Sequence, residues 1–263
     1  MITTESQDLV LLWLIPFSIK SHITDLNKKN YSTLNNNQLG SYLAGFIENS
    51  LPLKVRRLTK LERSQFSLSA DLKATLVGLL LGDLCAVKLK KGTNVRLHFE
   101  QGLVHKDCPY HLYELFESYC STAPKISNRL PDKRTGPIYT RVKFQTRSLP
   151  CFNELYDKFY PEGKKQIPEN IGELLTPLGL AYWLADDGTF SKSHNVITLS
   201  TDSYSESEVD LLISVLTDKF ELDCRKVKNG NGWRIVIKRS SLEKFRELVS
   251  PHVHSSMSHK SGL

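Results

Sequence analysis

Residues Leu180–Gly188 read LAYWLADDG, an apolar run that ends at two adjacent aspartates, Asp186 and Asp187. A run that is apolar on all sides predicts a helix that is buried nearly all round, rather than an amphipathic surface helix. Thr176 followed by Pro177 provides a capping side chain and a proline at the first helical position, so we expect the helix to begin there and to run to Asp187. The stretch therefore predicts a buried helix that presents a carboxylate at its C-terminal end.

A second apolar run, Leu76–Asp83, reads LVGLLLGD and also ends at a carboxylate. Both runs contain small residues, which allow two helix backbones to approach each other closely. If the two helices pack side by side in parallel, Asp83 and Asp187 emerge at the same end. The small residues are Gly78 and Gly82 in the first run, and Gly179, Ala181 and Ala185 in the second.

Two carboxylates in this position predict a site for divalent cations. The C-terminal end of a helix carries a partial negative charge, so two such ends with two aspartates form an unstable cluster unless cations bind there. Hard oxygen ligands suit Mg²⁺, which carboxylates and substrate phosphates hold together in phosphoryl chemistry. For either run alone, an aspartate that merely ends a buried helix is the simpler interpretation. Its recurrence in two similar halves favours a metal site at Asp83 and Asp187.

From residue 71 onward, the expected elements occur twice in the same order. Each copy reads α-β-β-α-β-β-α, which predicts two pseudo-symmetric halves of the α+β class, each with an antiparallel sheet. The first copy is expected as a helix to 84, strands at 86–91 and 94–101, a helix at 105–121, strands at 124–130 and 138–147, and a helix at 149–159. The second is expected as a helix at 176–187, strands at 189–192 and 195–200, a helix at 205–220, strands at 223–228 and 233–239, and a helix at 240–249.

The remaining segments frame these halves. We interpret 1–70 as an N-terminal extension and lead-in, because it contains an Asn-rich stretch and a basic cluster. Within it, GSYLAGFIENS at 40–50 is similar to the start of the acidic motifs, but Ser50 stands in the place of the aspartate, which indicates a non-catalytic helix. The expected divisions are then the first half at 71–160, a linker at 161–175, and the second half with a C-terminal tail at 176–263. That Ser-rich tail, with His252, His254 and His259, is interpreted as solvated rather than metal-binding.

Composition narrows the class of partner. The chain has 263 residues, 40% of them hydrophobic, and a formal net charge of +7, which suits a polyanion such as nucleic acid. Its five cysteines are odd in number and lack CxxC spacing, which disfavours a zinc site or a disulfide framework. No apolar run reaches the ~18 residues that a membrane span needs. We therefore expect reduced thiols and no membrane partner.

The predicted strands alternate between apolar and basic residues, as a sheet with one face on helices and one face on DNA requires. A solvated sheet face alternates in the same way, but the repeated positive charge favours DNA. The polar series are Arg96, His98 and Glu100; Arg141, Lys143, Gln145 and Arg147; Arg234 and Lys238; and Lys226 and Lys228. The residues expected to contact DNA are Lys88, Arg96, His98, Arg141, Lys143, Gln145, Lys192, Lys226 and Arg234.

The two acidic motifs together resemble those of the LAGLIDADG homing endonucleases, in the single-chain branch that carries both motifs. Two further features extend the resemblance over about residues 70–260. The second motif has the Thr-Pro lead-in of this branch, and FNELYDKFY at 152–160 with IPENI at 167–171 resembles its linker between the halves. It implies saddle-shaped sheets in the DNA major groove and motif helices at the interface between halves. Asp83 and Asp187 match the catalytic metal-binding aspartates, whereas Asp186 matches a position that is not the main ligand.

The resemblance also implies a function. A monomer would cut both strands of a long asymmetric DNA site, leaving short 3′ overhangs, with Mg²⁺ or alternatively Mn²⁺. Arg147 or Lys143, and Lys228 or Lys238, would assist the catalytic aspartates Asp83 and Asp187. Intron coding in organelles, the mitochondrion before the chloroplast, would be expected. A maturase that binds group I intron RNA is the alternative, alone or in addition. A DNA-binding protein that has lost cutting is disfavoured, because both aspartates are present.

Overall fold

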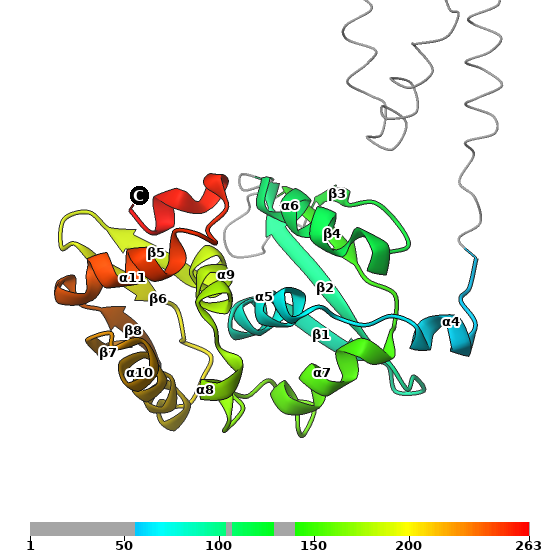
Figure 1. The fold of residues 1–263 in the computed structure, drawn as a ribbon, viewed down its shortest axis with the longest axis horizontal. Helices are drawn as coiled ribbons and strands as arrows, with labels where there is room; N and C mark the ends of the chain where they lie inside the picture. Colours follow the sequence, from blue (N-terminus) through cyan, green and yellow to red (C-terminus); the bar gives the residue numbers. More distant parts are fainter. Residues whose placement is uncertain (1–55, 104–106, 129–139, 263) are drawn as a thin grey trace, which may run out of the picture. The chain divides into compact units, whose positions relative to one another are not determined.

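The computed structural model describes residues 56–103, 107–128 and 140–262. The Asn-rich stretch and the motif-like segment at 40–50 lie outside the described residues. The order of elements in the described part confirms the prediction of two αββαββα halves (Figure 1).

The first half begins with a short lead-in helix and then follows the predicted order. Its elements are α4 (Lys60–Ser64), α5 (Ala70–Leu81), β1 (Cys85–Lys88), β2 (Val95–Gly102), α6 (Asp107–Phe116), the 3-10 turn η3 (Glu117–Tyr119), β3 (Lys125–Asn128), β4 (Thr140–Gln145), η4 (Pro150–Phe152) and α7 (Asn153–Phe159).

The second half repeats the order after one helical turn in the linker. Its elements are α8 (Ile171–Leu174), α9 (Pro177–Asp187), β5 (Gly188–Ser191), β6 (Val196–Leu199), α10 (Glu206–Phe220), β7 (Cys224–Asn229), β8 (Gly232–Ile237), η5 (Arg239–Ser241), α11 (Leu242–Val249) and η6 (Ser255–Lys260).

Local capping explains where the main helices begin. The Thr176 hydroxyl accepts the N–H of Gly179 while Pro177 takes the first helical position, so α9 starts as the sequence predicts. Ser205 and Glu208 form the reciprocal capping box at the start of α10. At the other end, α5 stops at Leu81, earlier than the predicted residue 84.

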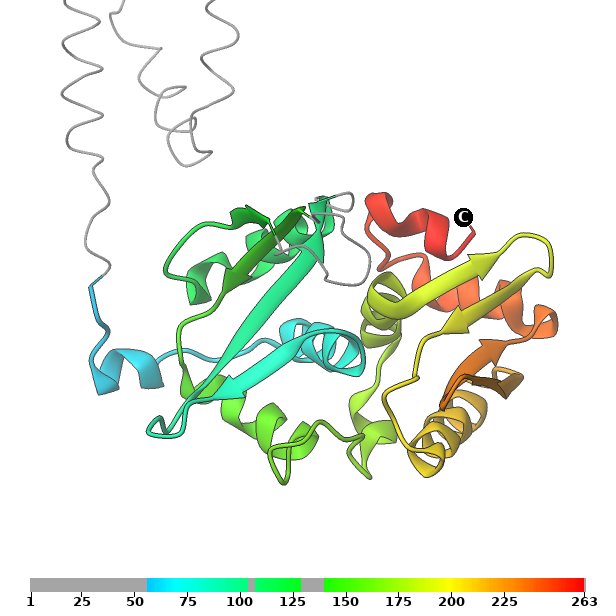
Figure 2. The same ribbon diagram turned by 180° about the vertical axis from the view of Figure 1, so that it is seen from behind.

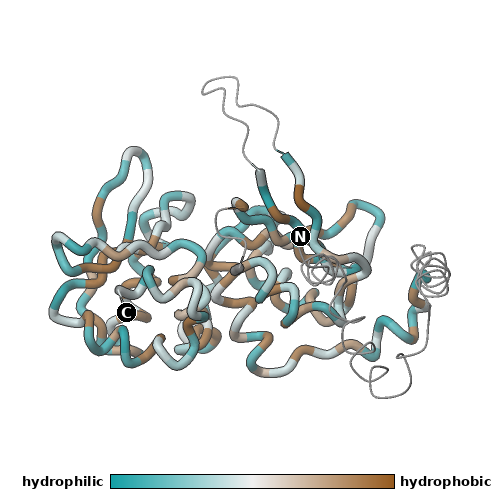
Figure 3. Tube along the Cα trace, turned by 90° about the horizontal axis from the view of Figure 1, so that it is seen from above, coloured by the Kyte–Doolittle hydropathy of each residue, from teal (hydrophilic) through white to brown (hydrophobic). Residues whose placement is uncertain are grey.

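Each half contains one four-stranded antiparallel sheet, and the two sheets have the same topology. The strand orders are β1-β2-β4-β3 and β5-β6-β8-β7. Helix α6 packs on β2 and β4 of the first sheet, and α10 packs on β7 and β8 of the second. Helices therefore cover one face of each sheet, as Figure 2 shows from behind. The outer loops are largely hydrophilic, while hydrophobic positions recur along strands and helices (Figure 3).

The motif helices α5 and α9 pack against each other between the two sheets. Every residue of α5 from Ala74 to Leu81 is buried, and in α9 Leu180, Trp183 and Leu184 are fully buried. The prediction that these helices are buried nearly all round and form the interface between the halves is confirmed. No helix in the described ranges combines the length and apolarity that crossing a membrane requires.

The prediction of a solvated C-terminal tail is wrong. Residues Ser255–Lys260 form the 3-10 helix η6, which packs against α6, α9 and β5. Met257 is only 2% exposed, and His254 caps the helix by accepting the N–H of Ser256. One apolar anchor among serines and histidines is too weak a pattern to predict a docked segment. The consequence is that the tail reaches the ends of the motif helices.

Candidate active site and nucleic-acid interface

The C-terminal ends of α5 and α9 meet, as predicted for parallel packing. The Asp83 N–H donates to Oδ2 of Asp186 over 2.6 Å, which joins the end of the first motif to the end of the second. Asp186 and Asp187 are consecutive, so three acidic residues from both halves lie close enough for their charges to interact. A separation of the two motifs to opposite sides of the molecule is thereby excluded.

The electrostatics of this cluster are unfavourable without a cation. Burial, together with the charges of Asp186 and Asp83, raises the pKa of Asp187 to about 7, while the charges of Lys165 and Lys260 oppose this rise. Burial also raises the pKa of Asp186 to about 6, although its hydrogen bond from the Asp83 N–H acts in the opposite direction. A bound cation would favour the ionised carboxylates and relieve their mutual repulsion.

Two lysines that the sequence analysis missed lie at this cluster. The Lys165 ammonium donates to the carbonyls of Gly82 and Leu84, at the end of α5. The Lys260 ammonium donates to the carbonyls of Ala185 (2.7 Å) and Asp186 (2.9 Å), at the end of α9. Each therefore places a positive charge at the negative end of a motif helix.

Opposing effects act on the pKa values of both lysines. Burial lowers the pKa of Lys165 and of Lys260, while the charges of the three aspartates raise it. An ammonium with a lowered pKa donates a proton more readily than an exposed one. The sequence contains one signal for these two lysines, which is their equivalent position in the two halves. Lys165 follows α7 and Lys260 follows α11, the last helix of each half.

The donor set fits a divalent cation shared with a substrate. Within the described ranges, no group of three or more His, Cys, Asp or Glu side chains forms a complete metal site. Carboxylates at the end of a helix pair supply hard oxygen ligands, and Mg²⁺ commonly takes its remaining ligands from phosphates and water. Asp83 and Asp187 therefore fit a cation whose coordination is completed when a phosphodiester binds.

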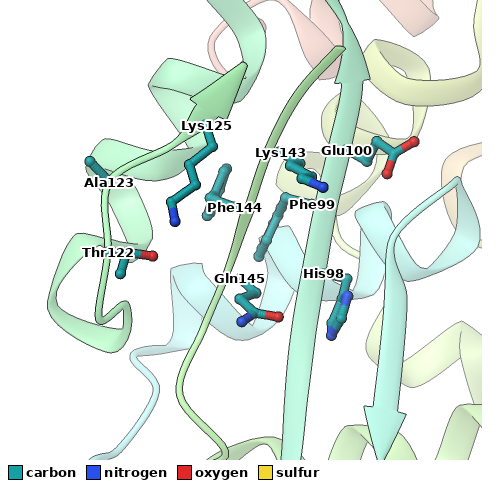
Figure 4. Close-up of a pocket in the computed structure, with 9 residues that line it drawn as sticks. All are labelled: His98, Phe99, Glu100, Thr122, Ala123, Lys125, Lys143, Phe144 and Gln145. Atoms are coloured by element: carbon teal, nitrogen blue, oxygen red, sulfur yellow. The ribbon is translucent and has the colours of Figure 1, made fainter. Parts of the chain in front are cut away.

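Each sheet has one face that points away from its covering helix, here called the groove face. The groove face of the first sheet carries most of the polar side chains expected to contact DNA. Strand pairing places His98 opposite Gln145 and Glu100 opposite Lys143, which puts these residues on the face away from α6. They line a concave surface, which Figure 4 shows with Lys125 beside Lys143. The buried partners of the alternation, such as Phe99 and Phe144, stack beneath it. The predicted alternation is confirmed for these strands.

Several polar atoms on this face lack a hydrogen-bond partner in the described part of the chain. A buried donor without a partner is costly in a folded protein unless a ligand or water satisfies it. Arg141 illustrates the pattern, because its Nη1 forms an ion pair with Glu100 while its Nε has no partner. The atoms are Arg96 Nε, His98 Nε2, Ser127 Oγ and Arg141 Nε.

Three lysines that we predicted on the DNA-contacting face of their sheets lie on the opposite face, so this prediction is wrong. Lys226 pairs with Glu206 (2.6 Å) and Asp210 (2.8 Å) of α10, so it lies on the helix side of the second sheet. Lys228 lies over the Trp233 ring on the same side. Lys88 Nζ lies 3.8 Å from Oδ1 of Asp157 in α7, so Lys88 also points away from the groove face. A K-V-K alternation fits either face, and only the strand register decides between them.

On the second sheet the groove face carries Arg225 and Arg234, which occupy the alternate positions of β7 and β8. The sequence analysis missed Arg225, because it assigned Lys226 to this face. Arg234 forms an ion pair with Asp202 over 2.8 Å. Lys192 is exposed in the turn between β5 and β6.

The structure does not bring the expected basic assistants to the aspartates. Arg147 donates to the carbonyl of Cys120, and Lys238 forms an ion pair with Asp223 over 2.7 Å. Lys228 packs on Trp233, and Lys143 lies in the groove of the first sheet. In the described part of the chain, Lys165 and Lys260 are the cations whose charges lower the pKa values of Asp186 and Asp187.

Comparison with known proteins agrees with this geometry. Residues 73–245 match the LAGLIDADG DNA endonuclease family. The chain belongs to this family. A probable intron-encoded endonuclease 1 of Wickerhamomyces canadensis is 30% identical to it, over 74% of this chain and 85% of that protein.

Two further similarities extend over most of the length of the matched proteins. The cytochrome b mRNA maturase bI2 of Debaryomyces hansenii is 28% identical, over 89% of each chain. The solved structure of the homing endonuclease I-WcaI bound to its DNA recognition sequence superposes with a TM-score of 0.73 at 28% identity, covering 80% of this chain and 95% of that one. The paired sheets and the interface of motif helices are thus the LAGLIDADG fold.

Proposed function

We propose that this chain is a metal-dependent, site-specific DNA endonuclease that hydrolyses phosphodiester bonds in both strands of a long asymmetric target. The observation that carries this proposal is the meeting of Asp83 with Asp186 and Asp187 at the end of the two motif helices, between two polar groove faces. The DNA-bound I-WcaI structure supports DNA as the partner. One chain contains both halves, which is consistent with action as a monomer.

Each residue of the cluster has a chemical role in this proposal. Asp83 and Asp187 hold Mg²⁺, with Mn²⁺ as an alternative. When bound, such a cation lowers the pKa of water and stabilises charge on the phosphate. Lys165 and Lys260 counter the negative helix ends, and their lowered pKa values suit them to give a proton to the departing oxygen. In this proposal Lys165 and Lys260 take the assisting role that the sequence assigned to Arg147 or Lys143 and to Lys228 or Lys238.

The groove faces supply binding and position. Arg96, His98, Arg141, Lys143 and Gln145 are proposed to contact DNA from the first sheet. From the second sheet and its turn, Arg225, Arg234 and Lys192 contribute. Cations on a groove face neutralise phosphates, while His, Gln and Arg side chains also read base edges.

The decisive experiment changes the aspartates without changing their size. Asp187→Asn and Asp83→Asn should abolish cleavage in Mg²⁺ but leave affinity for the target DNA within a few-fold, because the groove faces are intact. The target is first obtained by selecting cleaved sites from a randomised duplex library. Asp210→Asn, on the outer helix α10, is the matched control and should cut normally. Cleavage at the native rate by Asp187→Asn would refute the proposed site.

A second function, assistance in splicing a group I intron RNA, is favoured by the D. hansenii relative, which is named a maturase. A basic chain suits RNA as well as DNA. In an in vitro splicing assay, Asp187→Asn should retain any assistance, because splicing chemistry belongs to the RNA. A chain that gives no assistance at all would restrict the function to DNA. With relatives named for introns and for cytochrome b mRNA, we also propose an organellar location, the mitochondrion before the chloroplast.

A further inference from the structure

The two halves differ at the residue that precedes the motif carboxylate. That residue is Gly82 in the first half and Asp186 in the second. A Cβ built on Gly82 would lie 2.3 Å from Oδ2 of Asp186, a distance that real atoms do not adopt. The Asp186 side chain therefore occupies the space that any side chain at position 82 would need, and only one half can carry this acid.

Both carboxylate oxygens of Asp186 are bonded to the first half. Oδ2 accepts the Asp83 N–H over 2.6 Å, and Oδ1 accepts the Gln101 Nε2–H over 2.8 Å. Gln101 belongs to β2, and Asp83 follows α5. The second half thus fixes the end of the first motif through two separate elements.

The backbone shows why only the first half needs this contact. Helix α9 extends through Asp187, so helical hydrogen bonds fix the backbone that carries this carboxylate. Helix α5 ends at Leu81, two residues before Asp83, and the Asp83 N–H lies beyond the helical ladder. It donates instead to Asp186 Oδ2. Asp186 therefore supplies the hydrogen bond that the helix supplies for Asp187.

We propose that Asp186 is a positioning residue that orients Asp83 across the interface, so that the first-half active site depends on the second half. This inference rests on the proposed role of Asp83 as a metal ligand. It assigns the cation to Asp83 and Asp187, and assigns Asp186 the role of holding the Asp83 backbone in place. Loss of the contact should slow cleavage of one DNA strand more than the other.

The test is single-turnover cleavage of a target duplex labelled separately on each strand. Asp186→Ala removes both contacts, and a small misplacement of a reacting group typically costs up to about 10²-fold in rate. Asp186→Asn should stay within a few-fold of the native rate, because its Oδ1 still accepts the Asp83 N–H and the Gln101 amide can turn to accept from its Nδ2. Asp83→Glu, which displaces the first-half carboxylate, identifies the affected strand, and Asp187→Glu serves as the opposite reference.

We expect Asp186→Ala and Asp83→Glu to slow cleavage of the same DNA strand more than the other. Asp186→Asn should restore cleavage of that strand to near the native rate. Equal slowing of both strands by Asp186→Ala would overturn the proposal. An Asp186→Asn variant as slow as Asp186→Ala would also overturn it, because that result is expected if Asp186 binds the metal directly. If Asp186→Ala fails to fold, as judged by thermal melting, Gln101→Leu decides the question: the same strand preference supports the proposal, and native rates on both strands refute it. Normal cleavage by Asp83→Asn and Asp187→Asn would instead refute the active site itself.

Discussion

A Cβ added to Gly78 would lie 2.0 Å from the carbonyl oxygen of Gly179. The backbones of the two motif helices are therefore in direct contact, with no room for a side chain between them. Because Asp83 follows α5 by two residues and Asp187 is the last residue of α9, this contact sets the separation of the two acidic ends. Helix packing and active-site geometry thus depend on the same pair of glycines.

Gly78→Ala should destabilise the protein and impair cleavage together. The added methyl group meets backbone rather than a flexible side chain, so the helices must separate, and overpacking of this kind costs about 1–3 kcal/mol. Thermal melting and the cleavage rate measure the two effects. Gly102→Ala is the matched control for stability, because no atom lies within 4 Å of a Cβ built there. A Gly78→Ala protein that melts and cuts like the native one would contradict the finding.

The sequence predicts most of this fold because its strongest signals are local. The cap at Thr176, the proline at Pro177 and the capping box at Ser205 fix the starts of α9 and α10 without long-range information. The apolar runs that end in aspartate indicate buried helices, and their repetition indicates two halves. These are patterns over neighbouring residues, which sequence analysis reads directly.

The remaining site residues depend on contacts between distant segments. Lys165 and Lys260 lie in a linker and a Ser-rich tail, and only the docking of those segments brings them to the motif helices. The alternation at Lys226 likewise leaves the face undetermined, because a shift of one residue in register exchanges the two faces of a strand. The structure places Arg225 in the groove and Lys226 against α10.

Replacement of either half-buried lysine, Lys165 or Lys260, should slow cleavage without loss of DNA affinity. Lys165→Met and Lys260→Met keep the length of the side chain but remove the ammonium, and loss of a proton-transfer group typically costs about 10²–10⁴-fold. Arginine should not restore the rate, because guanidinium stays protonated. Single-turnover rates and binding titrations separate the two effects. Lys164→Met is the control, since Lys164 is exposed beside Lys165. Equal losses for Lys164→Met and Lys165→Met would argue for a general charge effect.

A divalent cation should stabilise the protein against heat through the clustered acids. A ligand that binds only the folded state at about 100 times its Kd adds about 2.7 kcal/mol. In EDTA, Asp187→Asn should melt above the native protein, because it removes one of three neighbouring negative charges. Adding Mg²⁺ should then raise the melting temperature of the native protein more than that of the variant. The same increment in both proteins would place the stabilising cation elsewhere.

His111 should contribute to stability above about pH 6.5 and lose that contribution on acidification, whereas the raised pKa values of Asp186 and Asp187 act in the opposite direction. Its Nε2 lies 3.0 Å from the Tyr182 hydroxyl, and its ring stacks on that of His254, with centroids 4.3 Å apart. Burial lowers the pKa of His111, the His254 charge lowers it further, and Glu114 opposes both. Below pH 6.5 the unfolded chain therefore binds a proton at His111 that the folded chain resists. The contribution of His111 to stability is full above that pH and is lost as pH falls through the lowered pKa of the folded state.

His111→Gln should reduce this acid-side loss, which the melting temperature between pH 8 and pH 5 would measure. Comparison with the native protein isolates His111 from other titrating groups. His252→Gln is the control, because His252 is exposed. An identical slope for His111→Gln and the native protein would show that His111 titrates alike in the folded and unfolded states.

DNA binding should depend on salt through the groove face and not through the helix face. Each phosphate contact contributes about one unit to the slope of log K against log salt concentration, so Lys143→Ala should reduce that slope by about 1. Lys226→Ala is the matched control, because Lys226 pairs with Glu206 and Asp210 on the opposite side of its sheet. Its removal takes the same charge from the chain but should leave the slope unchanged. Equal reductions for both variants would mean that net charge, and not the orientation set by strand register, governs contact with the phosphates.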